Sequence, residues 1–182
     1  MKTVIVDGGP LTPDQVAAVA LGHARARPGE DLDQRLRPAR KLVDDAVASE
    51  EIVYGITTGF GALATSHIGR KDAEALQYNL LRSHATGLGP PVSDELVRAM
   101  LLLRARTLAQ GYSGVRPVIV SKLLELLQRD ILPVVPSQGS VGASGDLAPF
   151  AHLALPLIGE GEVRVGGQSM PTSEAEFDPI EL

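Results

Sequence analysis

Apolar residues recur every three or four positions along most of the chain, which is the spacing of one face of an α-helix. One such face begins after Pro28-Gly29 and gathers six apolar residues. These residues are Leu32, Leu36, Ala39, Val43, Ala46 and Val47. The same spacing, together with helix start and stop signals, predicts further helices over residues 12–27, 71–85, 93–111, 114–129 and 146–158.

Local signals mark where two of these helices begin. Thr12 is a good cap, Pro13 suits the first helical position, and Gln15 completes a capping box. Ser93 is the corresponding cap of the helix that Asp94 begins, and an acidic first turn favours the helix dipole. These boundaries are therefore expected to be sharp.

Strand signals are few. The hydrophobic and polar residues of 2–6 alternate weakly, which predicts a short strand. Two short runs separated by Gly166-Gly167 predict a small β-hairpin near residues 162–170. We therefore expect a mainly α fold with a short N-terminal β element and this hairpin, in a single domain over residues 1–182.

Composition excludes several classes of function. The chain of 182 residues is 44% hydrophobic and 21% charged, as is usual for a globular domain. Its net charge of −5, without a basic cluster among aromatics, argues against nucleic acid. The most apolar stretch, residues 147–158, is too short to cross a membrane. The absence of cysteine and of a signal peptide fits the cytoplasm, and the four histidines show no metal-ligand spacing, so no metal site is expected.

The tripeptide Ala143-Ser144-Gly145 can react with itself. The amide nitrogen of Gly145 can attack the carbonyl carbon of Ala143 and close a five-membered ring. Loss of water from that ring, and of the Ser144 hydroxyl as a second water, leaves a methylidene-imidazolone. Glycine permits the close backbone approach, and a helix predicted to begin directly afterwards would polarise the ring through its dipole. The product is an electrophile that ordinary side chains do not supply.

From these residues alone, other interpretations of the segment stay open. A glycine-rich turn before a helix can serve packing alone. No lysine follows the glycines, so the phosphate-binding loop pattern fails. Ser144 is followed directly by Gly145, which does not match the hydrolase elbow Gly-x-Ser-x-Gly. His152 and Asp146 are nearby, yet the sequence does not place them as a catalytic triad.

Two further residues are candidates for chemistry. Tyr54 lies in the glycine- and threonine-rich stretch 50–69, which is either a surface loop or an active-site lid. His84 follows Leu76 and Leu80 at intervals of four, so it shares their helix face. A lone histidine there is either a satisfied core residue or a functional one.

Four separate segments resemble the aromatic amino acid ammonia-lyase family, and in particular its histidine-type members. They are residues 54–61 (the tyrosine loop, with Thr57 where asparagine is more usual), 76–85 (the substrate-selectivity helix), 111–116 and 139–152 (the prosthetic-group segment). The resemblance covers nearly the whole chain. It implies the N-terminal portion of the histidine/phenylalanine ammonia-lyase fold.

The resemblance also implies roles for single residues. Ala143, Ser144 and Gly145 would form the methylidene-imidazolone autocatalytically, without an external cofactor. Tyr54 would be the base that takes a β-proton from the substrate, and elimination would release ammonia and an α,β-unsaturated acid.

The substrate follows from a pair of neighbouring residues. Ser83 and His84 would recognise the substrate side chain, and this pair is similar to that of histidine-type members. Tyrosine-type members tend to show His-Leu there, and phenylalanine-type members Phe-Leu. The resemblance therefore implies L-histidine, or a related aromatic amino acid, as substrate and urocanate as product.

Family chains continue well beyond the length seen here. The resemblance implies that the C-terminal helical bundle, the carboxylate-binding arginine and a second catalytic tyrosine are absent. We therefore expect a partner chain that supplies them, a homo- or hetero-oligomer, and little activity of the isolated chain. The alternatives are a non-catalytic interaction subunit or fragment of a lyase, and a phenylalanine or tyrosine ammonia-lyase or aminomutase.

Overall fold

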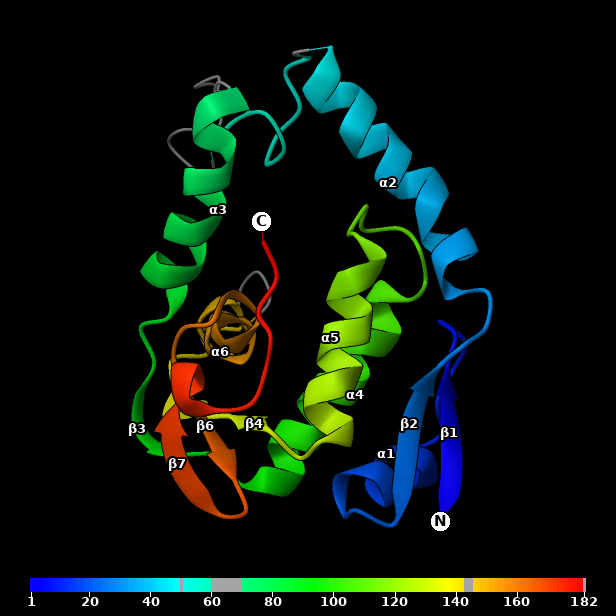
Figure 1. Ribbon diagram of the computed structural model, residues 1–182, viewed down its shortest axis with the longest axis vertical. Helices are drawn as coiled ribbons and strands as arrows, with labels where there is room; N and C mark the ends of the chain where they lie inside the picture. Colours follow the sequence, from blue (N-terminus) through cyan, green and yellow to red (C-terminus); the bar gives the residue numbers. More distant parts are fainter. Residues whose placement is uncertain (50, 60–69, 143–145, 182) are drawn as a thin grey trace.

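The computed structural model describes residues 1–49, 51–59, 70–142 and 146–181, and for residues 70–74 the backbone alone. The protein is mainly helical (Figure 1), as predicted. The helices are α1 (Pro13–Ala20), α2 (Leu32–Ala48), α3 (Arg70–His84), α4 (Asp94–Leu108), α5 (Pro117–Gln128) and α6 (Leu147–Ala154). Two 3₁₀ turns follow α6, namely η2 (Leu155–Ile158) and η3 (Thr172–Glu174).

In the described part of the chain, short strands form three small sheets. The strands are β1 (Lys2–Val6), β2 (Ala24–Pro28), β3 (Leu88–Pro91), β4 (Leu132–Pro133), β5 (Pro136–Gln138), β6 (Glu162–Val165) and β7 (Gln168–Pro171). β1 pairs with β2 in parallel, β3 with β5 antiparallel, and β4, β6 and β7 form an antiparallel sheet in that order. The predicted N-terminal strand and hairpin are both present.

The hairpin turn has glycine at both positions of its two-residue connection. Val165 pairs with Gln168, which leaves Gly166 and Gly167 as a two-residue connection. Both glycines have positive φ, 59° and 82°. Turns of this kind match the right-handed twist of the strands that they join, and they need residues that accept positive φ at both positions.

The first helix is shorter than predicted. The capping box is present, because Thr12 Oγ1 accepts from the Gln15 amide at 3.2 Å and Gln15 Oε1 accepts from the Thr12 amide at 2.8 Å. The expectation that this helix continues to about residue 27 is wrong. Gly22, at φ +74°, lies just beyond its end, and residues 24–28 instead form β2 against β1. Pairing with a distant strand overrides the local helix propensity there.

The core lies mainly between α4 and α5. Each helix turns a row of fully buried apolar side chains inward, Val97, Leu101, Leu102 and Ala105 from α4 and Val120, Leu123, Leu124 and Leu126 from α5. In Figure 1 these two helices occupy the middle of the molecule, with β1 and β2 on one side and α6 and the other strands on the other side. α5 therefore lies deep in the molecule.

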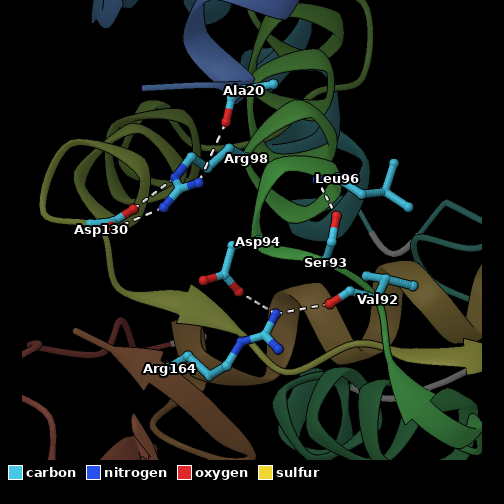
Figure 2. Close-up of polar contacts among 8 residues, drawn as sticks. All are labelled: Ala20, Val92, Ser93, Asp94, Leu96, Arg98, Asp130 and Arg164. Atoms are coloured by element: carbon cyan, nitrogen blue, oxygen red, sulfur yellow. Dashed lines mark hydrogen bonds and ion pairs between the residues drawn. The ribbon is translucent and has the colours of Figure 1, made fainter. Parts of the chain in front are cut away.

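Ion pairs and hydrogen bonds of two arginines connect the first half of α4 to the segment after α5 and to β6 (Figure 2). Arg98 donates to both carboxylate oxygens of Asp130, which follows α5, at 2.8 and 3.1 Å. Arg164 of β6 pairs with Asp94 in the first turn of α4, and donates to the carbonyl of Val92 at 2.8 Å. The hairpin and the central helices are thereby joined through the segment that leaves β3.

Candidate functional site

The end of α3 presents the predicted substrate-recognition pair. The Ser83 hydroxyl donates to the carbonyl of Leu80 at 3.0 Å, and His84 Nδ1 lies 2.8 Å from the same carbonyl oxygen. A carbonyl only accepts, so Nδ1 carries the proton in this contact, and a neutral ring then leaves Nε2 as an acceptor. Ser83 is exposed and His84 half-buried. His84 is therefore not enclosed in the core, and its functional role stays a prediction.

An ion pair holds α3 just before this pair of residues. Arg82 Nη2 lies 2.5 Å from Glu160 Oε1, and Arg82 Nε donates to both carboxylate oxygens at 3.1 Å. Glu160 follows η2, so the contact joins α3 to the segment after α6. The guanidinium lowers the pKa of Glu160 through this hydrogen bond, which keeps the carboxylate ionised.

A second contact holds the chain just after the pair. The Gly87 amide donates to His152 Nε2 on α6 at 3.0 Å. The next residue, Leu88, pairs with Gln138 at the end of β5. The chain that leaves α3 is thus fixed both to α6 and to the strand that leads into the prosthetic-group segment.

Close backbone contact reinforces this junction. A Cβ atom on Gly139 would lie 3.1 Å from Gly87 Cα and 3.2 Å from Ala148 Cβ, which is tighter than almost all real contacts. Gly139 has φ +143°, a conformation that side chains rarely accept. The structure therefore brings the chain just after Ser83 and His84 next to both flanks of the predicted tripeptide.

The tripeptide Ala143-Ser144-Gly145 itself lies outside the described residues. Its flanks are described. The Ser140 hydroxyl donates to the Asp146 carboxylate across it, and α6 begins at Leu147 with Asp146 at the N-cap position. The prediction that a helix begins directly after the tripeptide is confirmed. First-turn amides of a helix lack partners within it and favour negative charge at that end.

Tyr54 lies in the loop that follows α2. Its loop, residues 51–59, is held by two buried threonines: Thr57 Oγ1 accepts from the Val53 amide at 2.9 Å, and Thr58 Oγ1 from the Gly55 amide at 3.2 Å. The Tyr54 side chain is 63% exposed. In the view of Figure 1 this loop lies toward the beginning of α3, whereas Ser83 and His84 end that helix. The approach of Tyr54 to that pair and to the tripeptide stays a prediction.

His152 is the residue that sequence reasoning missed. Burial lowers its pKa below the usual 6.5, which favours the neutral ring that the Gly87 contact requires. The contact also occupies Nε2, so this nitrogen does not serve as a base toward Ser144 while the bond is intact. Its partner is 65 residues away in the chain, and no local pattern indicates such a pairing.

The described residues offer neither a metal site nor a membrane-spanning helix. Among residues 1–49, 51–59, 70–142 and 146–181, no group of three or more histidine, aspartate or glutamate side chains is placed to hold a metal ion. Within the same part of the chain, no helix combines the length and the apolar character needed to span a bilayer.

Comparisons with known proteins agree on one family. A family model described as aromatic amino acid lyase matches residues 11–178. The histidine ammonia-lyase of Gloeobacter violaceus is 51% identical over 183 residues, which cover 98% of this chain and 36% of that protein. The chain thus spans about a third of the length of the curated relatives that it matches.

Solved structures show the same similarity. The histidine ammonia-lyase of Trypanosoma cruzi superimposes with a TM-score of 0.89 at 35% identity, covering 100% of this chain and 35% of that one. The tyrosine aminomutase of Streptomyces globisporus superimposes with a TM-score of 0.91 at 35% identity, covering 99% and 34%. The fold therefore matches the N-terminal part of the ammonia-lyase fold.

Proposed function

Because the chain belongs to the aromatic amino acid lyase family, we propose that it supplies the electrophile and the side-chain recognition pair of a histidine ammonia-lyase. The reaction is the non-oxidative deamination of L-histidine to urocanate and ammonia. One observation supports the proposal: the chain just after the Ser83-His84 pair binds His152 through Gly87 and pairs with Gln138 through Leu88, and these two partners lie on either side of Ala143-Ser144-Gly145 in the sequence. The 51% identity to a histidine ammonia-lyase supports the same substrate.

The described flanks fit a methylidene-imidazolone formed from Ala143, Ser144 and Gly145. Gly142 has φ +71° and open space where a Cβ would stand, so the chain can bend sharply there. The electron-poor ring would sit at the start of α6, where the helix dipole favours negative charge. When formed, this group supplies the electrophile that activates the amino group for departure.

The remaining roles fall to ordinary side chains. With Nδ1 bound to the Leu80 carbonyl, a neutral His84 ring would offer Nε2 as an acceptor to the N–H of the substrate imidazole. The adjacent Ser83 hydroxyl would offer a second polar contact. Tyr54 would take the β-proton, on a loop whose buried threonines hold its backbone while the ring stays exposed.

Complete activity needs more protein than this chain. It spans 36% of the length of the Gloeobacter relative. We propose that a partner chain, or further copies in a homo- or hetero-oligomer, supplies the group that binds the substrate carboxylate and the rest of the active site. The isolated chain would then show little or no lyase activity.

The test is an assay of the chain alone and of the chain co-expressed with the product of its neighbouring gene. Histidine, tyrosine and phenylalanine are offered separately, and ammonia and the ultraviolet absorbance of the unsaturated acid are followed. We expect urocanate only from the co-expressed assembly. Steady urocanate production by the isolated chain would contradict the partner requirement, and a preference for tyrosine or phenylalanine would contradict the substrate.

A second candidate is an aminomutase, which the similarity to a tyrosine aminomutase favours. The two activities differ in product, because an aminomutase returns the amino group to the neighbouring carbon and releases a β-amino acid. Chromatography of the products therefore separates them. A chain that binds its partner yet keeps a linear tripeptide would instead be a non-catalytic subunit.

A further inference from the structure

We propose that His152 is a positioning residue, which fixes the Ser83-His84 end of α3 to the helix that follows the tripeptide. The roles of the Ser83-His84 pair and of the tripeptide rest on the proposed function. The contact between the Gly87 amide and His152 Nε2, at 3.0 Å, is independent of that function.

The donor and acceptor in this contact are determined by chemistry. A backbone amide can only donate, so Nε2 of His152 must be unprotonated and the ring proton must lie on Nδ1. The ring is half-buried, and loss of the acceptor would leave the Gly87 amide without this partner in a crowded setting. A buried donor without a partner costs more than an ordinary hydrogen bond contributes.

Packing around Gly87 explains why the contact is so direct. A Cβ atom there would lie 3.0 Å from Pro136 Cβ, 3.1 Å from His152 Nε2 and 3.2 Å from the Gln138 carbonyl. The backbone after α3 is therefore pressed between β5 and α6, and a side chain at this position would separate them. Only glycine allows the ring nitrogen to reach the amide without displacing its neighbours.

Two long-range contacts flank the Ser83-His84 pair in the chain. Arg82 binds Glu160 on one side of it, and Gly87 binds His152 on the other. The Arg82 side chain is 53% exposed, and exposed ion pairs contribute little because water and salt screen them. The His152 contact is the more enclosed of the two, so it should dominate the placement of Ser83 and His84.

The experiment compares His152→Leu, His152→Gln and an exposed control, His23→Leu, in the 182-residue chain. Leucine removes the acceptor and keeps a comparable volume, whereas the amide oxygen of glutamine can reach the position of Nε2. Amide hydrogen exchange is followed by NMR at Gly87 and at residues 83–85, with the α5 amides as a measure of global stability. A lost hydrogen bond should speed exchange at Gly87 about tenfold in His152→Leu, with faster exchange also at 83–85.

We expect His152→Gln to restore most of the protection and His23→Leu to change nothing. Unchanged exchange at Gly87 in His152→Leu, or equal loss of protection in the glutamine variant, would overturn the proposal.

If His152→Leu does not fold, nitrogen-15 spectra of the unmutated chain decide instead, since a proton on Nε2 is incompatible with the contact. In an active assembly, His152→Leu should raise KM for L-histidine more than it lowers kcat. An assembly without any lyase activity would refute the proposed function, while the exchange data would still judge the positioning role.

Discussion

Replacing Gly139 by alanine tests the junction between α3, β5 and α6 directly. The new Cβ would lie 3.1 Å from Gly87 Cα and 3.2 Å from Ala148 Cβ, and neither neighbour is the free end of a flexible side chain. Overpacking of this kind costs about 1–3 kcal/mol. The φ of +143° adds backbone strain of about 1–3 kcal/mol for a residue with a side chain.

The same segment offers a matched control in Gly142→Ala. Gly142 also has a positive φ, +71°, but nothing lies within 4 Å of the Cβ position. Its replacement should cost only the strain of the left-handed conformation, about 1–2 kcal/mol. Alanine also lowers the conformational entropy of the unfolded chain, which stabilises both variants by about 0.4–1 kcal/mol. This gain is the same in both and cancels in the comparison.

The expected difference between the two variants is therefore about 1–3 kcal/mol in the free energy of unfolding. For a chain of this length each kcal/mol shifts Tm by about 2–4 °C, so Gly139→Ala should melt about 2–12 °C below Gly142→Ala. Urea and thermal unfolding followed by circular dichroism measure both quantities. Equal stability of the two variants would show that the close approach of residues 87, 139 and 148 does not exist in solution.

Three further outcomes are expected. Burial lowers the pKa of His152, so the unfolded state takes up its proton first as the pH falls. The contribution of His152 to the free energy of unfolding should be complete above about pH 6.5 and should be lost as the pH falls toward the folded-state pKa. Urea unfolding between pH 8 and 5 should therefore show a flatter dependence of stability on pH in His152→Gln. In an active assembly, Tyr54→Phe should lower kcat about 100-fold or more while the mass of the chain still lacks two waters; normal turnover would exclude Tyr54 as the base. Exchanging Ser83 for histidine together with His84 for leucine should shift preference from histidine toward tyrosine, and unchanged selectivity would remove the pair from substrate recognition.

Helix positions could be predicted because their signals are local. The capping box at Thr12, the cap at Ser93 and the apolar face of α5 each lie within a few residues of the structure that they specify. The hairpin around Gly166-Gly167 belongs to the same class, since its turn residues suffice to define it. Such elements follow from short stretches of sequence.

Long-range pairings could not be predicted in the same way. Residues 24–28 form β2 alongside β1, and the alternation of alanine with arginine over 24–27 is too short to identify that partner. The pairing of β3 with β5 likewise joins segments about 50 residues apart. These contacts depend on how the core helices bring distant segments together.

The candidate site shows the same contrast between local sequence signals and long-range contacts. The types and order of residues were enough to single out the tripeptide, Tyr54 and the Ser83-His84 pair. The two contacts that flank the pair, Arg82 with Glu160 and Gly87 with His152, join residues 78 and 65 positions apart. Sequence reasoning therefore proposed the chemical groups, and the structure shows which long-range contacts lie on either side of the Ser83-His84 pair.

The central claim is that Ala143-Ser144-Gly145 becomes an electrophile, and intact mass tests it most directly. The chain is purified from the co-expressed assembly, with Ser144→Ala as a control that has no hydroxyl to lose. We predict a mass about 36 Da below that of the sequence, equal to two waters, in the unmutated chain and not in the control. An unmodified mass in an assembly that deaminates histidine would contradict the account.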